Sequence, residues 1–225
     1  MKAHVIGASI HGRYLVDVPD GRGPFPLLVG FHGYAERAEH MLDALRDIRG
    51  ARKWLLVSVQ ALNRFYTRSN EVVANWMTRE DREPAIHDNI RYVASVVAAV
   101  RRDDACGDVV VYAGFSQGVA MAYRALAFAA MRTEGLPAAS GGIMLAGDVP
   151  PDVAPHAAAL PPLLIGRGTS DQWYTEQKAA ADLTTLQAAG VAPRVHVFDG
   201  GHVWDASFVA ASGGFLDLLS PPRRA

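Results

Sequence analysis

The sequence has little of three features that would assign it to a specialised class of protein. It contains one cysteine, Cys106, so a secreted fold held together by disulfides within the chain is excluded. No apolar run approaches the roughly 18 residues that a membrane-spanning helix needs. The formal net charge is −1, and lysine and arginine are scattered, so the electrostatic signature of a nucleic-acid-binding protein is missing as well.

The first residues also lack the apolar segment and the small-residue cleavage site of a signal peptide. We therefore expect a cytoplasmic protein with no stable membrane association and no nucleic-acid partner. Half of the residues are hydrophobic and a fifth are charged, which is ordinary for a globular protein. At 225 residues, we expect a single domain that covers 1–225. The sequence leaves open whether copies of the chain form a homo-oligomer.

Short apolar runs alternate with longer amphipathic segments along the chain. Residues 3–9 and 11–18 indicate an antiparallel hairpin at one edge of a sheet. Further strands are expected at 26–31, 54–59, 109–115, 142–146, 163–166 and 194–198, and helices at 36–49, 85–102, 117–132, 175–190 and 203–219. In the segment 85–102 the apolar residues recur every three or four positions, which places Asn89 on the outer face. This alternation predicts an α/β fold, with a mostly parallel sheet, helices on both faces and an antiparallel edge at the N-terminus.

A serine follows the apolar run 109–115, just before the helical segment that starts at 117. It is the centre of the G-F-S-Q-G motif at 114–118, which fits the G-x-S-x-G nucleophile elbow. In such an elbow a sharp turn between strand and helix exposes the serine hydroxyl, and side chains at the flanking positions would collide with the neighbouring elements. Ser116 is therefore the predicted nucleophile.

A serine needs a base, and that base needs an orienting acid. His202 follows the last expected strand on a Gly-Gly loop, whereas His196 lies within that strand. Asp171 follows the expected strand 163–166, which gives the chain order Ser, Asp, His that is typical of α/β-hydrolases. Asp148, after the preceding strand, is the alternative acid. We predict His202 as the base and Asp171 as the acid.

The run F-H-G-Y at 31–34 ends an early strand with a glycine turn. Such a loop can direct the backbone N–H of Tyr34 at a developing oxyanion, with the N–H of Gln117 as its partner. His32 is then expected to shape the loop rather than to act as a base.

Together these motifs resemble the phospholipase/carboxylesterase family, which includes acyl-protein thioesterases, within the α/β-hydrolase superfamily. The resemblance covers about 26–215 and rests on F-H-G-Y at 31–34, G-F-S-Q-G at 114–118, G-R-G-T-S-D at 166–171 and G-G-H at 200–202. It implies an α/β-hydrolase fold and no metal or organic cofactor. Val119 and Ala35 stand where the family usually has glycine.

The substrate pocket is expected under loops that carry aromatic and apolar residues. The candidates for its lining are Phe65, Tyr66, Trp76, Met77 and Trp173, since ligand sites are mostly apolar. Asn75-Trp76 also resembles the tryptophan segment that lies beside the acyl pocket in the family. The segment 61–84 has no clear element and is too short for a lid domain, so we expect at most a small flap there. A small flap favours soluble substrates with short or medium acyl chains.

The sequence therefore predicts a serine hydrolase that cleaves carboxylic esters or thioesters through an acyl-enzyme, with a small ester or thioester as its partner. Two alternatives stay open. One is amide or peptide cleavage by the same triad, and the other is a non-catalytic binding protein that uses the cleft as a receptor for small molecules.

Overall fold

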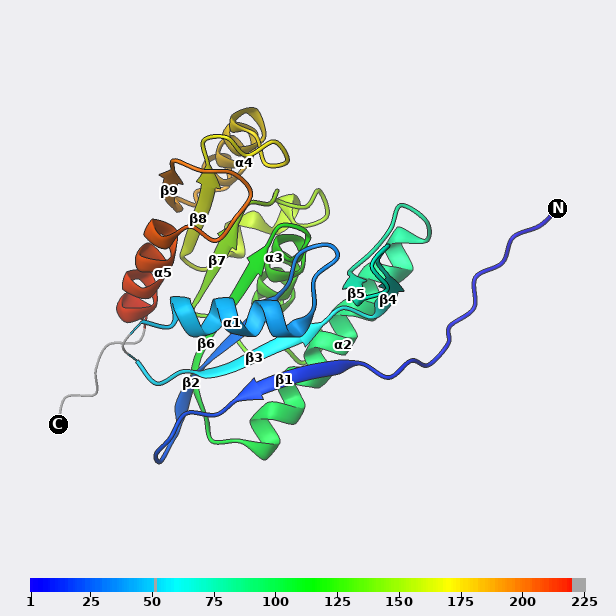
Figure 1. The fold of residues 1–225 in the computed structure, drawn as a ribbon, viewed down its shortest axis with the longest axis horizontal. Helices are drawn as coiled ribbons and strands as arrows, with labels where there is room; N and C mark the ends of the chain where they lie inside the picture. Colours follow the sequence, from blue (N-terminus) through cyan, green and yellow to red (C-terminus); the bar gives the residue numbers. More distant parts are fainter. Residues whose placement is uncertain (51, 220–225) are drawn as a thin grey trace.

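The computed structural model describes residues 1–50 and 52–219, and its centre is a mostly parallel sheet (Figure 1). In these residues seven strands pair in the order β1-β3-β2-β6-β7-β8-β9, and β1 alone runs antiparallel to its neighbour. The strands of this sheet are β1 (Arg13–Asp17), β2 (Phe25–Phe31), β3 (Leu55–Gln60), β6 (Cys106–Phe115), β7 (Gly141–Leu145), β8 (Leu163–Gly168) and β9 (Arg194–Phe198). The predicted fold class, including its antiparallel edge, is confirmed.

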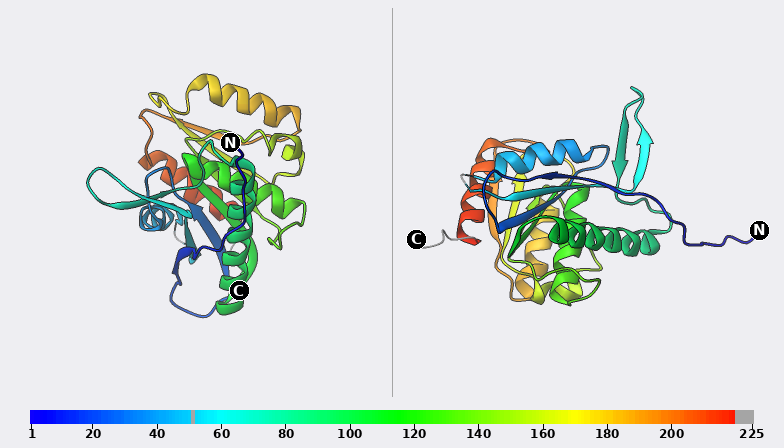
Figure 2. Two further views of the ribbon diagram at one scale, coloured as in Figure 1. Left: turned by 90° about the vertical axis from the view of Figure 1, so that its right-hand side faces the viewer. Right: turned by 90° about the horizontal axis from the view of Figure 1, so that it is seen from below.

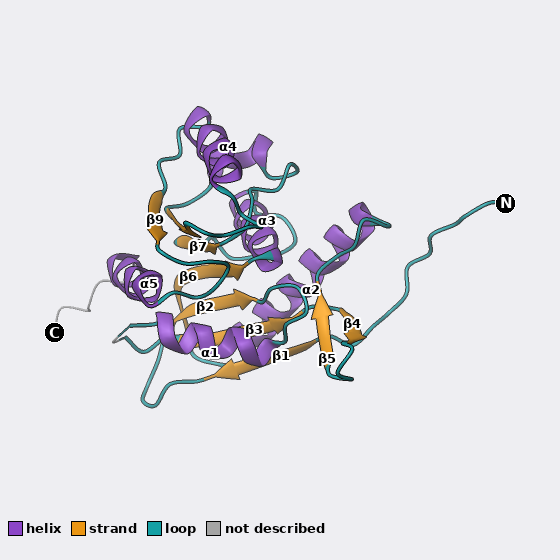
Figure 3. Cartoon of the chain, turned by 45° about the horizontal axis from the view of Figure 1, so that its top comes forward, coloured by secondary structure: helices purple, strands orange, loops and turns teal. Residues whose placement is uncertain are grey.

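Helices cover both faces of the sheet, which is why its central strands are apolar along their whole length (Figures 2 and 3). Two helices, α1 (Ala38–Ile48) and α5 (Ala206–Leu219), lie on one face. The other face carries α2 (Arg82–Asp103), α3 (Gln117–Ala130) and α4 (Glu176–Ala188), with a short 3₁₀ turn η1 (Ala154–Ala159) against α3 and α4. None of the described helices is both long and apolar enough to cross a membrane.

The predicted N-terminal hairpin is wrong in its first half. Residues 3–9 form no strand and are exposed throughout. The second half does form an edge strand, β1, but it pairs with β3. In the structure Val5 and Ile6 are 65% and 90% exposed, so this segment does not bury its apolar residues as a strand of the sheet would. Pairing with β3 instead places Leu15 and Val16 against the core.

The segment 61–84 contains a hairpin that the sequence did not predict. It consists of β4 (Asn63–Tyr66) and β5 (Val72–Asn75), which pair antiparallel and form a separate two-stranded sheet. The hairpin projects from the body of the molecule (Figure 2). Its strands have only four residues each; β4 is largely exposed, whereas β5 buries Val73, Ala74 and Asn75, so neither strand shows the alternation that would have revealed it.

Asn89 was predicted on the outer face of α2, and the structure corrects this. Its side chain is buried, and Nδ2 donates to the carbonyl oxygen of Trp76 at 2.6 Å and to that of Ala85 at 2.7 Å. The loop after β5 passes over α2 at this point, so a side chain that periodicity places outside is covered by a backbone that needs a donor.

Candidate active site

Ser116 occupies the turn between β6 and α3. Its backbone has φ 53° and ψ −121°, a region that side-chain-bearing residues rarely adopt and that is typical of strained functional turns. The turn is held on both sides, because the N–H of Ser116 donates to the carbonyl of Leu145 at 2.9 Å and its own carbonyl accepts from Val119 at 3.0 Å. The elbow predicted from the motif is therefore present in the backbone.

The glycines of the motif are required by close packing. A Cβ atom on Gly114 would lie 2.5 Å from the carbonyl oxygen of Gly118, and one on Gly118 would overlap the carbonyl oxygen of Phe31. Both contacts are with backbone, which cannot turn away as a side chain can. Strand β6, helix α3 and strand β2 therefore approach one another more closely here than any larger residue allows.

His202 and Asp171 are joined by a hydrogen bond. Nδ1 of His202 lies 2.9 Å from Oδ2 of Asp171. The other carboxylate oxygen accepts from the backbone N–H groups of Trp173 at 2.8 Å and Tyr174 at 2.9 Å. The carboxylate is buried and fixed at both oxygens, so it can hold the imidazole in the tautomer whose Nε2 is free to accept a proton.

The loops that carry these two residues pack directly on each other. The N–H of Ser170 donates to the carbonyl of Gly200 at 2.8 Å, and the N–H of Thr169 donates to that of Phe198 at 2.9 Å. A Cβ atom on Gly168 would overlap the carbonyl oxygens of Gly200 and Gly201. The glycine at 168 thus lets the acid loop and the histidine loop meet.

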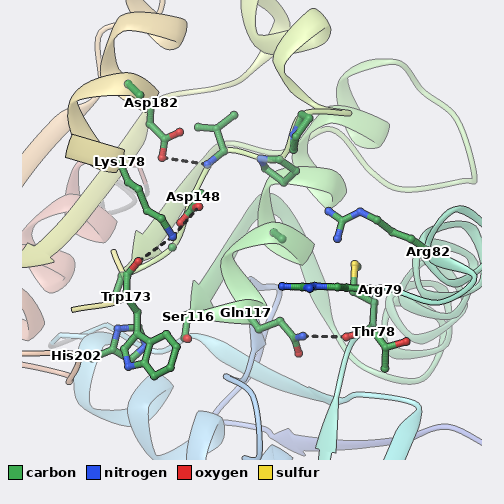
Figure 4. Close-up of a pocket in the computed structure, with 18 residues that line it drawn as sticks. Thr78, Arg79, Arg82, Ser116, Gln117, Asp148, Trp173, Lys178, Asp182 and His202 are labelled. Atoms are coloured by element: carbon green, nitrogen blue, oxygen red, sulfur yellow. Dashed lines mark hydrogen bonds and ion pairs between the residues drawn. The ribbon is translucent and has the colours of Figure 1, made fainter. Parts of the chain in front are cut away.

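Ser116 and His202 line the same cavity, which has a volume of about 630 Å³ (Figure 4). The cavity lies beyond the carboxyl ends of the strands, where chemistry is expected in an open α/β sheet. Among the described residues no hydrogen bond joins the Ser116 hydroxyl to the His202 ring. In enzymes without a bound substrate, hydrogen bonds between catalytic groups are often long and tighten only in the substrate complex.

The loop that follows β2 is fixed by His32, which is fully buried. Its Nε2 accepts from the N–H of Ala61 at 3.0 Å, so the ring proton lies on Nδ1, which donates to the carbonyl of Gly33 at 2.7 Å. Burial lowers the pKa of His32 to about 4 despite that hydrogen bond. The ring is therefore neutral near pH 7 and, as predicted, shapes the loop.

Glu36 fixes the other end of this loop. Its Oε2 accepts from the N–H of Gly33 at 2.7 Å, and burial raises the pKa of its carboxyl group. Two backbone hydrogen bonds of 3.0 Å, from Ala35 to Ala74 and from Ala74 to Glu36, tie the loop to β5. Among the described residues the N–H of Tyr34 has no acceptor, and it is the one that the sequence assigned to an oxyanion.

Gln117 connects the elbow to the loop after β5, a role that the sequence did not indicate. Its side-chain oxygen accepts from the N–H of Trp76 at 2.9 Å, and its Nε2 donates to the carbonyl of Met77 at 3.1 Å. Its own N–H is at the first position of α3, where the helix offers no acceptor, and none is found in the described part of the chain.

Of the five residues predicted to line the pocket, Met77 and Trp173 do so. The prediction is wrong for the other three in this cavity. Trp76 is fully buried behind it, with its indole N–H donating to the carbonyl of His32 at 2.9 Å. Phe65 and Tyr66 belong to the projecting hairpin, where the Phe65 ring packs on that of Tyr34. Trp76 is therefore part of the core, whereas Phe65 and Tyr66 lie on the projecting hairpin.

The alternative acid and base have other partners. Asp148 forms an ion pair with Lys178 at 3.4 Å, and His196 contacts the hydroxyl of Ser207 at 2.9 Å. Among the described residues no hydrogen bond or ion pair joins either of them to His202 or Ser116, which favours Asp171 and His202 over these alternatives.

The cavity also has charged residues that sequence reasoning missed: Arg79, Arg82, Lys178 and Asp182. Asp182 accepts at one oxygen from the N–H of Val149 and the hydroxyl of Tyr174, and burial raises its pKa to about 6. In the sequence these residues resemble ordinary solvated helix and loop surface, so no signal distinguished them. Among the described residues no group of three or more His, Cys, Asp or Glu side chains is arranged to hold a metal ion.

No family model matches the sequence, and no curated protein matches it. Solved structures do match. They include esterase PE8 (TM-score 0.71, 22% identity, 93% of this chain and 98% of that one). Acyl-protein thioesterase 2 from Zea mays matches with TM-score 0.70 and 19% identity over 93% of this chain and 99% of that one. A carboxylesterase from Bacillus cereus matches with TM-score 0.70 and 15% identity over 93% and 95%. The chain therefore has the α/β-hydrolase fold.

Proposed function

We propose that this chain is a serine hydrolase that cleaves carboxylic esters or thioesters, with Ser116 as nucleophile, His202 as base and Asp171 as orienting acid. The observation that carries the proposal is the 2.9 Å contact between His202 and Asp171 beside the cavity that Ser116 also lines. A binding protein would need neither a strained serine elbow nor an imidazole backed by a buried carboxylate.

In the proposed mechanism, the Ser116 hydroxyl attacks the substrate carbonyl carbon while His202 Nε2 takes its proton. The N–H groups of Tyr34 and Gln117 donate hydrogen bonds to the resulting oxyanion, and one such donor typically lowers the activation barrier by about 2.7–4 kcal/mol. The imidazolium then gives its proton to the leaving alcohol or thiol, and an acyl-enzyme remains. Water repeats the sequence and releases the carboxylic acid.

The shape and lining of the cavity support the proposed substrate class. It is open, it is partly apolar through Met77 and Trp173, and its volume suits short or medium acyl chains. The matched esterase, thioesterase and carboxylesterase structures support ester or thioester chemistry and membership of the phospholipase/carboxylesterase family. A single domain covering 1–225 without a cofactor belongs to the same proposal, and a cytoplasmic location stays a prediction from the sequence.

The test is labelling with a fluorophosphonate together with hydrolysis of 4-nitrophenyl esters and matched thioesters of increasing acyl length. We expect the wild-type protein to be labelled and to hydrolyse the shorter esters. Ser116→Ala should lose both signals while its melting temperature and circular dichroism stay close to wild type.

Ser95→Ala is the matched control, because Ser95 is an exposed helix serine that bonds only its own turn. It should behave as wild type. Full hydrolysis by Ser116→Ala would show that another group performs the reaction. If matched amides react faster than esters, the reaction is amide cleavage, and if no substrate reacts and no label is incorporated, the binding-protein alternative stands.

A further inference from the structure

Two exposed arginines line one end of the cavity and have no partner of their own within the described part of the chain. Arg79 and Arg82 extend into the cavity from the side opposite Trp173 and His202 (Figure 4). Within the part of the chain that the structure describes, neither has an ion pair or a side-chain hydrogen bond. The other cation of the cavity, Lys178, is neutralised by Asp148 and also donates to a backbone carbonyl.

The acidic residues of the same stretch face elsewhere. The sequence at 78–83 reads T-R-E-D-R-E, so arginines and carboxylates alternate. Glu80 and Asp81 line a separate hollow beside residues 5 and 10, and Glu83 lines a groove between α2 and α3. The turn that leads into α2 therefore places the two arginines along the cavity and the three carboxylates away from it.

The remaining carboxylates near the arginines are already engaged. Asp152 forms a bidentate ion pair with the buried Arg124 at 2.7 and 2.8 Å. The positive charge of Arg82 also contributes to lowering the pKa of Asp152, but Arg82 forms no ion pair with it. Asp182 lies across the cavity and accepts two hydrogen bonds from the protein (Figure 4). A concave, partly apolar wall strengthens the field of an unpaired guanidinium, and the planar fork of this group matches a carboxylate.

From this arrangement we infer that the cavity takes esters or thioesters whose acyl chain ends in a carboxylate, the half-esters of dicarboxylic acids, with Arg79 and Arg82 binding that carboxylate. The inference rests on the proposed function, because it uses the direction of the reaction. The leaving group must lie next to His202, which protonates it, so the acyl chain extends to the opposite side. That side is where the two guanidinium groups are.

The experiment compares matched substrates. The 4-nitrophenyl half-esters of succinate, glutarate, adipate and suberate are paired with neutral esters of the same acyl length, and the Ser116→Ala protein serves as blank for self-hydrolysis. We expect kcat/KM to favour the half-ester by about tenfold at the best chain length, equivalent to about 1.4 kcal/mol. The ratio should fall at high ionic strength, because exposed charges are screened.

Arg79→Gln/Arg82→Gln should reduce this ratio to about one. The matched control is Arg22→Gln, an exposed arginine that lines a different hollow, beside Pro24, Phe25 and Gly107; it should keep the wild-type ratio. A second pair, 3-acetoxybenzoate and phenyl acetate, carries the charge on the leaving group. A preference confined to that pair would overturn the assignment of the carboxylate to the acyl side.

A binding measurement separates the inference from the proposed function. Calorimetric titration of the Ser116→Ala protein with adipate and with hexanoate needs no turnover, and adipate should bind more tightly unless both arginines are replaced. If neutral esters are hydrolysed but half-esters and adipate show no advantage, the inference is wrong and the hydrolase stands. If no ester is hydrolysed but the arginines still select adipate, the hydrolase is wrong and the anion site stands.

Discussion

Acid should destabilise this protein through the buried imidazole ring of His32. The pKa of His32 is lowered to about 4 in the folded state by burial, whereas an unfolded histidine titrates near 6.5. The unfolded chain therefore gains a proton over a range of pH in which the folded chain cannot, and folding stability falls as pH is lowered from about 6.5 to about 4. Each pKa unit corresponds to about 1.4 kcal/mol, so the full loss is about 3 kcal/mol and the loss between pH 7 and pH 5 is about 2 kcal/mol.

The structure gives the reason for this loss. A proton on Nε2 of His32 would face the N–H of Ala61, which now donates to that nitrogen, so charging replaces a buried hydrogen bond with two opposed donors. The measurement is urea unfolding of wild type and His32→Gln at pH 7 and pH 5. The free energy of unfolding of wild type should fall by about 2 kcal/mol more than that of the variant.

The comparison of variants is needed because Asp182 contributes with opposite sign over part of the same range. His87→Gln is the matched control, since His87 is an exposed histidine on α2, and it should follow wild type. Equal losses for wild type and His32→Gln would refute the assignment of the acid sensitivity to this ring.

Three further predictions concern residues around the cavity. Burial raises the pKa of Asp182 in the folded protein to about 6, so its ionisation destabilises the fold as pH rises from about 4 to 6. The Asp182→Asn variant should therefore be more stable than wild type by up to about 3 kcal/mol at pH 8 and equally stable below pH 4. Thermal unfolding at both pH values measures this difference. Gln117→Ala removes both side-chain hydrogen bonds to the segment 76–77, and we expect a loss of about 1–3 kcal/mol in urea unfolding together with a lower kcat for ester hydrolysis; unchanged kcat would show that the segment does not support the site. Gly118→Ala should cost about 2 kcal/mol or more, whereas Gly201→Ala, whose added Cβ meets nothing within 4 Å, should cost less than about 1 kcal/mol; equal costs would contradict the packing argument.

The fold was predictable because its signals are local and repeated. Strand β9 has the predicted limits, and the other strands of the central sheet after β1 lie within a few residues of theirs, since each is a short apolar run that ends at a turn. The placement of Ser116, Asp171 and His202 at one end of the sheet followed from the rule that parallel strands end at a common edge. These inferences need only the order of residues along the chain.

The parts that could not be predicted depend on specific side-chain hydrogen bonds that leave no regular pattern in the sequence. The side chain of Gln117 binds the backbone 40 residues away, and Glu36 turns back onto Gly33, so neither role leaves a periodic pattern. Trp76 was expected in the pocket because it is aromatic and near the site, but the carbonyl of His32 needs a donor and the indole supplies it. The sequence thus indicated the positions of the three candidate residues around the cavity more reliably than it indicated the residues that support them.

The hairpin of β4 and β5 is a site where the chain should accept inserted or exchanged residues. Its base is fixed by backbone bonds at Ala74 and by Gln117 at Trp76, while residues 68–71 at its tip are exposed and do not line the cavity. Peptides or affinity tags inserted between Thr67 and Glu71 should therefore be displayed away from the main sheet, and exchange of this loop should leave the residues of the cavity in place.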